Sequence, residues 1–164
     1  MWMKRLQLSM RKFFLTFFYS GLLPKAPGTW GTVAGLLVGV LIVKSFGWTT
    51  LFLATVLLSV VSIKEIDKYE KDVGCHDSSE IVVDEVAGIW LSMCITGAVS
   101  PLYLALNFIF FRVFDIWKPS IIGRIDRDVA GGLGVMGDDL VAGVFGAICS
   151  GAVYMGIQEI MKII

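Results

Sequence analysis

Long apolar runs alternate with charged segments along the chain. Three runs contain no charged residue, namely 26–43, 86–111 and 140–158, and a fourth, 45–63, is separated from the first by Lys44 alone. A helix needs about 20 apolar residues to cross the hydrocarbon core of a bilayer, with a range of about 17 to 25. Because backbone groups in hydrocarbon must bond within their own segment, these runs predict helices. Three of the four fit one membrane-spanning helix each.

The run 86–111 is longer than the others and fits two arrangements. Pro101 lies near its middle, so the run forms either one long kinked helix or a hairpin of two short helices. Twelve of the fourteen Lys and Arg residues fall in three segments: 1–25, 64–85 and 112–139. Basic residues tend to stay on the cytoplasmic side of a membrane, which places all three segments on one face. The chain must then leave that face and return within the run, so we favour the hairpin.

Residues 1–25 form a basic and aromatic segment. Four basic residues precede the apolar stretch 13–23: Lys4, Arg5, Arg11 and Lys12. Signal peptides share this pattern, but no small-residue cleavage site follows. The segment is better interpreted as a helix lying on an anionic leaflet. A second charged segment, 64–72, predicts a helix that extends out of the membrane, and Gly47-Trp48 predicts a tight turn between the first two spans.

The composition supports a membrane protein. Hydrophobic residues make up 56% of the chain and charged residues 17%, with a mean hydropathy of +0.78, whereas soluble domains carry about 25% charged residues. The net charge is zero, and all fourteen acids follow residue 64. Nucleic-acid-binding domains are usually basic, so we expect no nucleic-acid partner. The chain 1–164 is predicted to be one all-α domain, a small polytopic bundle of about four to five membrane helices or half-helices.

Acidic residues gather at the expected ends of the apolar helices. Asp84 and Glu85 precede one run, Asp138 and Asp139 precede another, and Asp115 follows the longest. The helix dipole stabilises an acid near a helix N-terminus, but this explains one acid at each end and not two. Charges at membrane depth are costly and usually functional. We therefore expect these acids to share a site at the cytoplasmic ends of the helices.

Five carboxylates without counter-charges would repel one another. A hard divalent cation removes this repulsion, and oxygen ligands without a matching set of His or Cys favour Mg²⁺ over Zn²⁺. Mg²⁺ commonly binds together with substrate phosphates. Three basic residues are candidates to bind such a phosphate: Lys118, Arg124 and Arg127. The residues alone therefore predict metal-assisted phosphoryl chemistry at a membrane surface.

A segment rich in Pro, Gly and Thr, residues 23–32, leads into the first apolar helix. Free N–H groups and hydroxyls at a helix N-terminus can bind an anion, which makes Thr29, Gly31 and Thr32 candidates for phosphate binding. The alternative is a helix cap followed by small residues that allow close packing. His76 is the only histidine, and its place beside a charged loop is more typical of a solvated or capping residue than of a ligand.

Four motifs occur in a defined order: PGTWGT, IVVDEVAG, FRVFDIWKP and DRDVAGGLGVMGDDLVAGV. Together they resemble the phosphatidylglycerophosphatase A family, from Gly21 to Gly146. The resemblance implies a multi-pass protein of the bacterial inner membrane with its active site facing the cytoplasm. It also implies Mg²⁺-dependent removal of the terminal phosphate of phosphatidylglycerophosphate, a phospholipid, to give phosphatidylglycerol. The family often has Ser where Thr32 stands, and the hydroxyl is kept.

The resemblance further implies the roles of the acids. It places metal-binding and catalytic groups on five residues: Asp84, Glu85, Asp115, Asp138 and Asp139. Our hypothesis assigns Asp84, Asp138 and Asp139 to the metal and leaves Glu85 or Asp115 as the base. The sequence has no CxxxxxR loop, no DxD motif at Asp115 and no second histidine. These absences leave attack on phosphorus by a water that the metal or a carboxylate activates.

Two alternatives stay open at this point. The chain could be a soluble or peripheral phosphatase that acts on another phosphate ester. It could also be a small membrane carrier, in which case acids would line an ion path near the midplane of the bilayer. The acids stand at the ends of the runs, which favours the enzyme.

Overall fold

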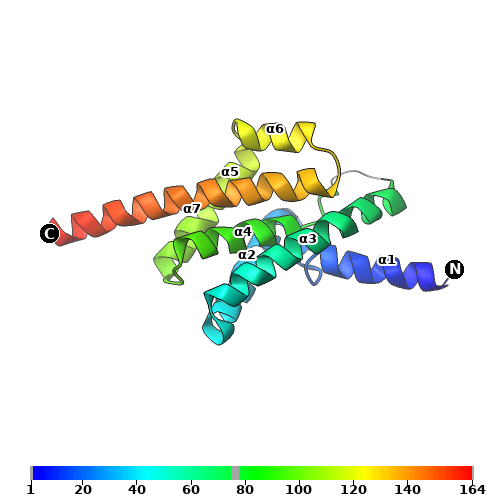
Figure 1. Cartoon of the computed structure of the whole chain (residues 1–164), viewed down its shortest axis with the longest axis horizontal. Helices are drawn as coiled ribbons and strands as arrows, with labels where there is room; N and C mark the ends of the chain where they lie inside the picture. The colour runs from blue at the N-terminus through cyan, green and yellow to red at the C-terminus, as the bar shows by residue number, and fades with distance from the viewer. Residues whose placement is uncertain (1, 75–77, 164) are drawn as a thin grey trace.

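The computed structural model describes residues 2–74 and 78–163, and in these ranges every regular element is a helix (Figure 1). The elements are α1 (Trp2–Leu15), the short 3-10 helix η1 (Ser20–Leu22), α2 (Pro27–Phe46), α3 (Trp48–Val73), α4 (Val83–Thr96), α5 (Pro101–Trp117), α6 (Ile121–Asp128) and α7 (Gly132–Ile163). The all-α prediction is confirmed. His76 lies outside the described residues.

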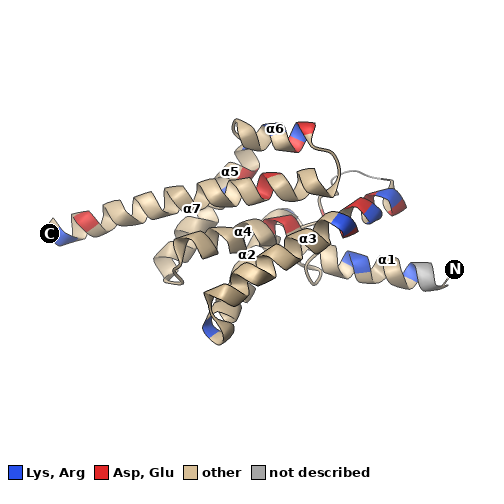
Figure 2. Cartoon of the chain, in the orientation of Figure 1, with Lys and Arg blue, Asp and Glu red and all other residues tan. Residues whose placement is uncertain are grey.

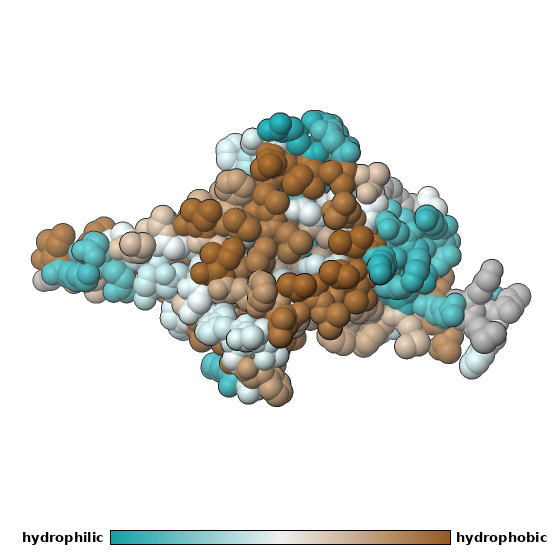
Figure 3. Space-filling model, in the orientation of Figure 1, coloured by the Kyte–Doolittle hydropathy of each residue, from teal (hydrophilic) through white to brown (hydrophobic). Residues whose placement is uncertain are grey.

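Three of the described helices, α2, α3 and α7, are long and apolar enough to cross a bilayer. Their outward-facing side chains include Leu37 and Leu57, which are 61% and 65% exposed. Figure 3 shows this apolar surface as a broad region flanked by hydrophilic patches. An apolar surface of this extent is unusual in a soluble monomer and is the expected surface of a bundle in lipid. The turn between α2 and α3 forms at Gly47, whose φ of 85° favours glycine.

The longest apolar run forms the expected hairpin. α4 ends at Thr96 and is followed by Gly97, which has a φ of 60°, and α5 begins at Pro101. Inside the bundle, the Asn107 side-chain amide donates a hydrogen bond of 2.9 Å to the Thr96 hydroxyl, which links the two arms. The arms have 14 and 17 residues. The first residues of α4 and the last residues of α5 therefore return to the same end of the bundle.

The last helix begins earlier than the sequence suggested. The uncharged run predicted a helix over 140–158, preceded by Asp138 and Asp139, but α7 already begins at Gly132. A Cβ atom on Gly132 would overlap the backbone of Ile63 in α3. Gly132 therefore allows close packing of α7 against α3. As a result, Asp138 and Asp139 lie in the second turn of α7.

Small residues let α2 approach α4 closely. Gly31, Gly35 and Gly39 are buried and recur every four residues, which places them on one face of α2. A Cβ atom on Gly35 would lie 3.1 Å from the Cα atom of Val86. Close approach of backbones at small residues stabilises helix pairs in membranes through van der Waals contact.

The helices α4 and α7 also touch through their backbones. A Cβ atom on Gly143 would overlap the carbonyl oxygen of Gly88, and one on Gly88 would lie 2.7 Å from the carbonyl oxygen of Asp139. No side chain larger than hydrogen fits at this crossing. The contact holds the first turn of α4 beside the second turn of α7, where the acidic residues lie.

Most of the charged residues lie toward one end of the bundle, as Figure 2 shows. There α1 packs against the polar extension of α3, because Arg11 contacts Glu65 at 2.9 Å and also contacts Asp72. Lys12 contacts Glu80 at 2.6 Å. Burial opposes the charge of Glu80, but hydrogen bonds from Lys12 and Tyr69 lower the pKa of its carboxyl below the usual value. Two basic residues of the N-terminal segment are therefore paired within the chain, and contact of this segment with a leaflet stays a prediction.

The crossing of α4 and α7 can be tested by Gly143→Ala. The added methyl group must push the two helices apart, and we expect the free energy of unfolding to fall by about 1–3 kcal/mol, the usual cost of overpacking. Titration with denaturant in micelles, followed by circular dichroism, would measure the change. Gly151→Ala is the matched control, because a Cβ atom at this position of α7 has nothing within 4 Å. Equal losses in both variants would contradict the close contact.

Candidate functional site

The five predicted acids lie in one pocket of about 290 Å³ at the charged end of the bundle. Its charged lining residues are Asp84, Glu85, Arg112, Asp115, Lys118, Asp126, Asp138 and Asp139. They come from α4, from α5 and the residue after it, from α6 and from α7. Six carboxylates therefore face two cations. Because ionised carboxylates in a partly desolvated pocket repel one another, the arrangement of the two cations decides which acids remain uncompensated.

The two cations each pair with particular acids. Arg112 donates a hydrogen bond to Asp115, three residues later in α5. Lys118 lies directly after α5 and bonds to Asp138 at 2.7 Å and to Asp126. Partial burial opposes the charge of Lys118, but the hydrogen bonds to Asp126 and Asp138 raise its pKa above the usual value. Lys118 therefore stays protonated at neutral pH.

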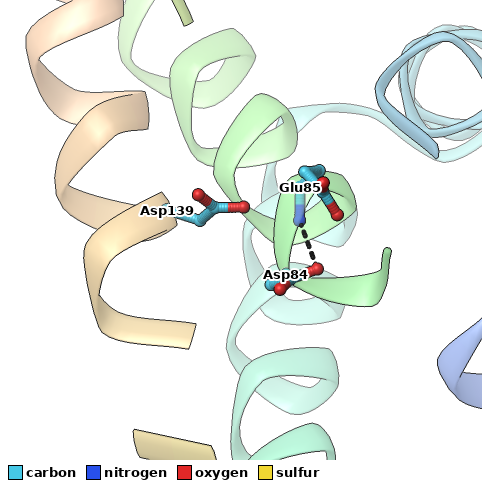
Figure 4. A group of neighbouring side chains, drawn as sticks. All are labelled: Asp84, Glu85 and Asp139. Atoms are coloured by element: carbon cyan, nitrogen blue, oxygen red, sulfur yellow. Dashed lines mark hydrogen bonds between the residues drawn. The ribbon is translucent and has the colours of Figure 1, made fainter. Parts of the chain in front are cut away.

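The remaining acids, Asp84, Glu85 and Asp139, form a tight group (Figure 4). One carboxylate oxygen from each lies within 4.8 Å of the others. Asp84 and Glu85 stand in the first turn of α4, where Asp84 accepts a hydrogen bond of 3.0 Å from the Glu85 N–H, and Asp139 reaches toward them from α7. Asp84 and Asp139 are only 8% and 3% exposed. Arg112 lies 3.7 Å from Glu85, farther than from Asp115.

The chemistry of this group fits a hard divalent cation. All of its donors are carboxylate oxygens, the ligands that Mg²⁺ prefers. Among the described residues, Glu85 Oε2 is buried and has no hydrogen-bond partner, and a buried acceptor of this kind is costly unless something binds it. The group differs at one position from the expected ligand set, because Glu85 stands where we expected Asp138. Asp138 lies outside this group and pairs with Lys118 through Oδ2, although its Oδ1 is also buried without a hydrogen-bond partner.

Gly28, at the start of α2, makes room for this group. A Cβ atom at this position would overlap Glu85 Oε1 and lie 3.1 Å from Arg112 Nη1. Gly28, Arg112 and Asp126 line the pocket and were not predicted as site residues from the sequence. The available signals were the place of Gly28 in PGTWGT and the spacing of Arg112 three residues before Asp115.

The other residues expected to bind phosphate do not line the pocket. The Thr32 hydroxyl is buried and donates a hydrogen bond of 2.7 Å to the Gly28 carbonyl, and Gly31 packs against Val82. Thr29 also lies outside the lining. The surroundings of Gly31 and Thr32 support the alternative of close packing that the sequence left open.

Two expected phosphate-binding residues lie on α6. Arg124 is exposed, and Arg127 bonds at 2.9 Å to its neighbour Asp128 on the surface. Neither residue lines the pocket. Their contact with a phosphate stays a prediction, whereas Lys118 is already at the pocket.

Comparison with known proteins gives consistent matches. Residues 13–154 match the family model of phosphatidylglycerophosphatase A. The chain is similar to phosphatidylglycerophosphatase A of Haemophilus influenzae, with 34% identity over 131 residues and 80% of each chain covered. It is also similar to phosphatidylglycerophosphatase A of Escherichia coli, with 37% identity over 130 residues that cover 79% of this chain and 75% of the relative.

A further relative comes from Bacteroides thetaiotaomicron and carries a provisional name as a phosphatidylinositol-3-phosphatase. It is 34% identical over 139 residues, which cover 81% of this chain and 86% of the relative. No solved structure matches the chain.

The role of Gly28 can be tested without an activity assay. A ligand that binds only the folded protein raises its thermal stability, so we expect Mg²⁺ to raise the melting temperature of the wild type. Gly28→Ala should weaken this response, because the methyl group displaces the Glu85 carboxylate. Gly151→Ala should respond as the wild type does. If Mg²⁺ raised the melting temperature of Gly28→Ala as much as that of the wild type, the result would contradict a role of Gly28 in metal binding.

Proposed function

The chain belongs to the phosphatidylglycerophosphatase A family, and on this basis we propose that it hydrolyses phosphatidylglycerophosphate to phosphatidylglycerol and phosphate in a Mg²⁺-dependent reaction. One observation carries the proposal for this chain. Three carboxylates, of which Asp84 and Asp139 are buried and Glu85 has only Arg112 at 3.7 Å, stand beside two cations, Arg112 and Lys118, at the charged end of an apolar bundle. A divalent cation would offset the charge of these carboxylates, and a phosphate oxygen could then bind to that cation and to the two basic side chains.

The proposed metal ligands are Asp84, Glu85 and Asp139. A bound Mg²⁺ would act as a Lewis acid, polarising an oxygen of the phosphate and offsetting its negative charge. The two neighbouring cations would bind other phosphate oxygens. A hydrogen bond to Asp138 holds the Lys118 side chain in place, and its raised pKa keeps it protonated at neutral pH. Positioned donors of this kind stabilise the charge that develops during phosphoryl transfer.

We assign the role of base to Asp115. It lines the same pocket, and its hydrogen bond from Arg112 fixes the direction of the carboxylate. Asp115 accepts a proton from the attacking water as the water oxygen bonds to phosphorus. The bond between phosphorus and the glycerol oxygen breaks, and the proton is then available to that leaving oxygen. A positioned general base contributes about 10²–10⁴-fold to rate.

The proposed location is the bacterial inner membrane, with the pocket facing the cytoplasm. The Lys and Arg residues that surround the pocket end of the bundle support this orientation through the positive-inside tendency. A lipid substrate keeps its acyl chains in the leaflet and presents its phosphates at the headgroup level. A pocket at the helix ends can therefore take the phosphate without removing the lipid from the bilayer.

A second candidate is a phosphatase of a different phospholipid headgroup. The provisional name of the relative from Bacteroides thetaiotaomicron supports it. Phosphate release from phosphatidylglycerophosphate and from phosphatidylinositol 3-phosphate, measured in parallel with purified protein, would separate the two. Faster release from the inositol lipid would favour the second candidate.

The assignment of ligand and base can be tested with two variants. Asp139→Asn should raise the Mg²⁺ concentration needed for half-maximal phosphate release by about tenfold or more, because even an outer-shell partner is worth about 10–100-fold. Asp115→Asn should lower kcat by about 100-fold or more and leave that Mg²⁺ concentration unchanged. Removing Mg²⁺ with a chelator should abolish activity in every active variant.

Glu159→Gln is the matched control for these variants. Glu159 is an exposed acid near the far end of α7 and pairs with Lys162. This variant should behave as the wild type does. Wild-type kinetics in both Asp115→Asn and Asp139→Asn would exclude the proposed site.

A further inference from the structure

An apolar groove of about 320 Å³ lies between α2 and α5. Its lining includes Val33 and Leu37 of α2 and Leu104, Ala105 and Ile109 of α5. All of its lining residues are apolar, and Leu37 and Ile109 are 61% and 52% exposed. The groove therefore opens on the surface that faces lipid.

The groove and the acidic pocket lie on the same helix faces. On α5, Ile116 and Arg112 line the pocket, and Ile109 and Ala105 line the groove. These four residues are spaced by four, three and four positions, so they form one stripe along the helix.

The opposite wall of the groove repeats this arrangement. Ala26, just before α2, lines the pocket, and Val33 and Leu37 line the groove at spacings of seven and four. Both walls of the groove therefore lead from the pocket into the membrane.

The depth of the groove matches the structure of a phospholipid. Val33 lies seven residues after Ala26, and Ile109 lies seven residues before Ile116, which corresponds to about 10 Å at about 1.5 Å per residue. The headgroup layer of one leaflet is about 5–8 Å thick, from a total bilayer of about 40–45 Å and a core of about 30 Å. A lipid with its phosphate in the pocket therefore has its acyl chains at the level of the groove.

We propose that the groove between α2 and α5 holds one acyl chain of the phospholipid whose phosphate occupies the acidic pocket. The inference rests on the proposed function and adds a second binding region to it. Charged side chains at the helix ends bind the phosphate, and apolar side chains along α2 and α5 pack against the acyl chain. Such a groove selects lipid esters over water-soluble phosphate esters.

Ala105→Trp tests the groove, because the larger side chain fills it from the wall of α5. In mixed micelles we expect the KM for long-chain phosphatidylglycerophosphate to rise by about threefold to tenfold. The effect is moderate because the chain passes from one apolar environment to another and loses only packing contacts. Ala105→Leu fills less of the groove and should give a smaller rise. The Ki of inorganic phosphate as a competitive inhibitor reports on the acidic pocket alone and should stay unchanged in both variants.

Ala152→Trp is the matched control. Ala152 is exposed on α7 and lines neither the groove nor the pocket, so this variant should keep the wild-type KM and Ki. An unchanged KM in Ala105→Trp would overturn the groove proposal and leave the proposed function standing. A KM and a Ki that rise together would also overturn it, because the pocket itself would then be damaged. A wild-type protein that releases no phosphate from the lipid would overturn the proposed function, and the groove proposal with it.

Discussion

The central constraint on this molecule is an excess of buried negative charge at one end of an apolar bundle. Arg112 and Lys118 can neutralise only part of the acidic pocket, and their close ion pairs leave Asp84, Glu85 and Asp139 together. Desolvated like charges at this separation destabilise the fold unless a cation joins them. A divalent cation would offset this charge and would also bind a phosphate oxygen, which connects the stability of the site to its chemistry.

This charge balance depends on how closely the helices approach. The buried glycines of α2, namely Gly31, Gly35 and Gly39, let α2 approach α4 closely. The crossing of Gly88 with Gly143 brings the backbones of α4 and α7 into contact, so the acids of these two helices lie side by side. The hairpin of α4 and α5 then returns Asp115 to the same end of the bundle. Glycine therefore positions the site in two ways, by setting the spacing of the helices and, at Gly28, by leaving space for the Glu85 carboxylate.

The sequence predicts those features that follow from length, periodicity and charge. The runs without charge predict the spans, and Pro101 with the distribution of basic residues predicts the hairpin. Features that depend on three-dimensional packing were not accessible. In the sequence Gly132 resembles a loop residue, and only the structure shows that it packs against the backbone of Ile63. Spacing alone also cannot show that Lys118 pairs with Asp138, so the sequence could not choose between Asp138 and Glu85 as the third member of the tight acidic group.

Anomalous diffraction from crystals of the wild-type protein grown with Mn²⁺ in place of Mg²⁺ tests the central claim most directly. Mn²⁺ shares the preference of Mg²⁺ for carboxylate oxygens and is visible by its anomalous signal. We expect an anomalous peak for a Mn²⁺ ion that is bound by Asp84, Glu85 and Asp139. Mn²⁺ bound only elsewhere, or a pocket that stays free of metal at saturating Mn²⁺, would contradict it.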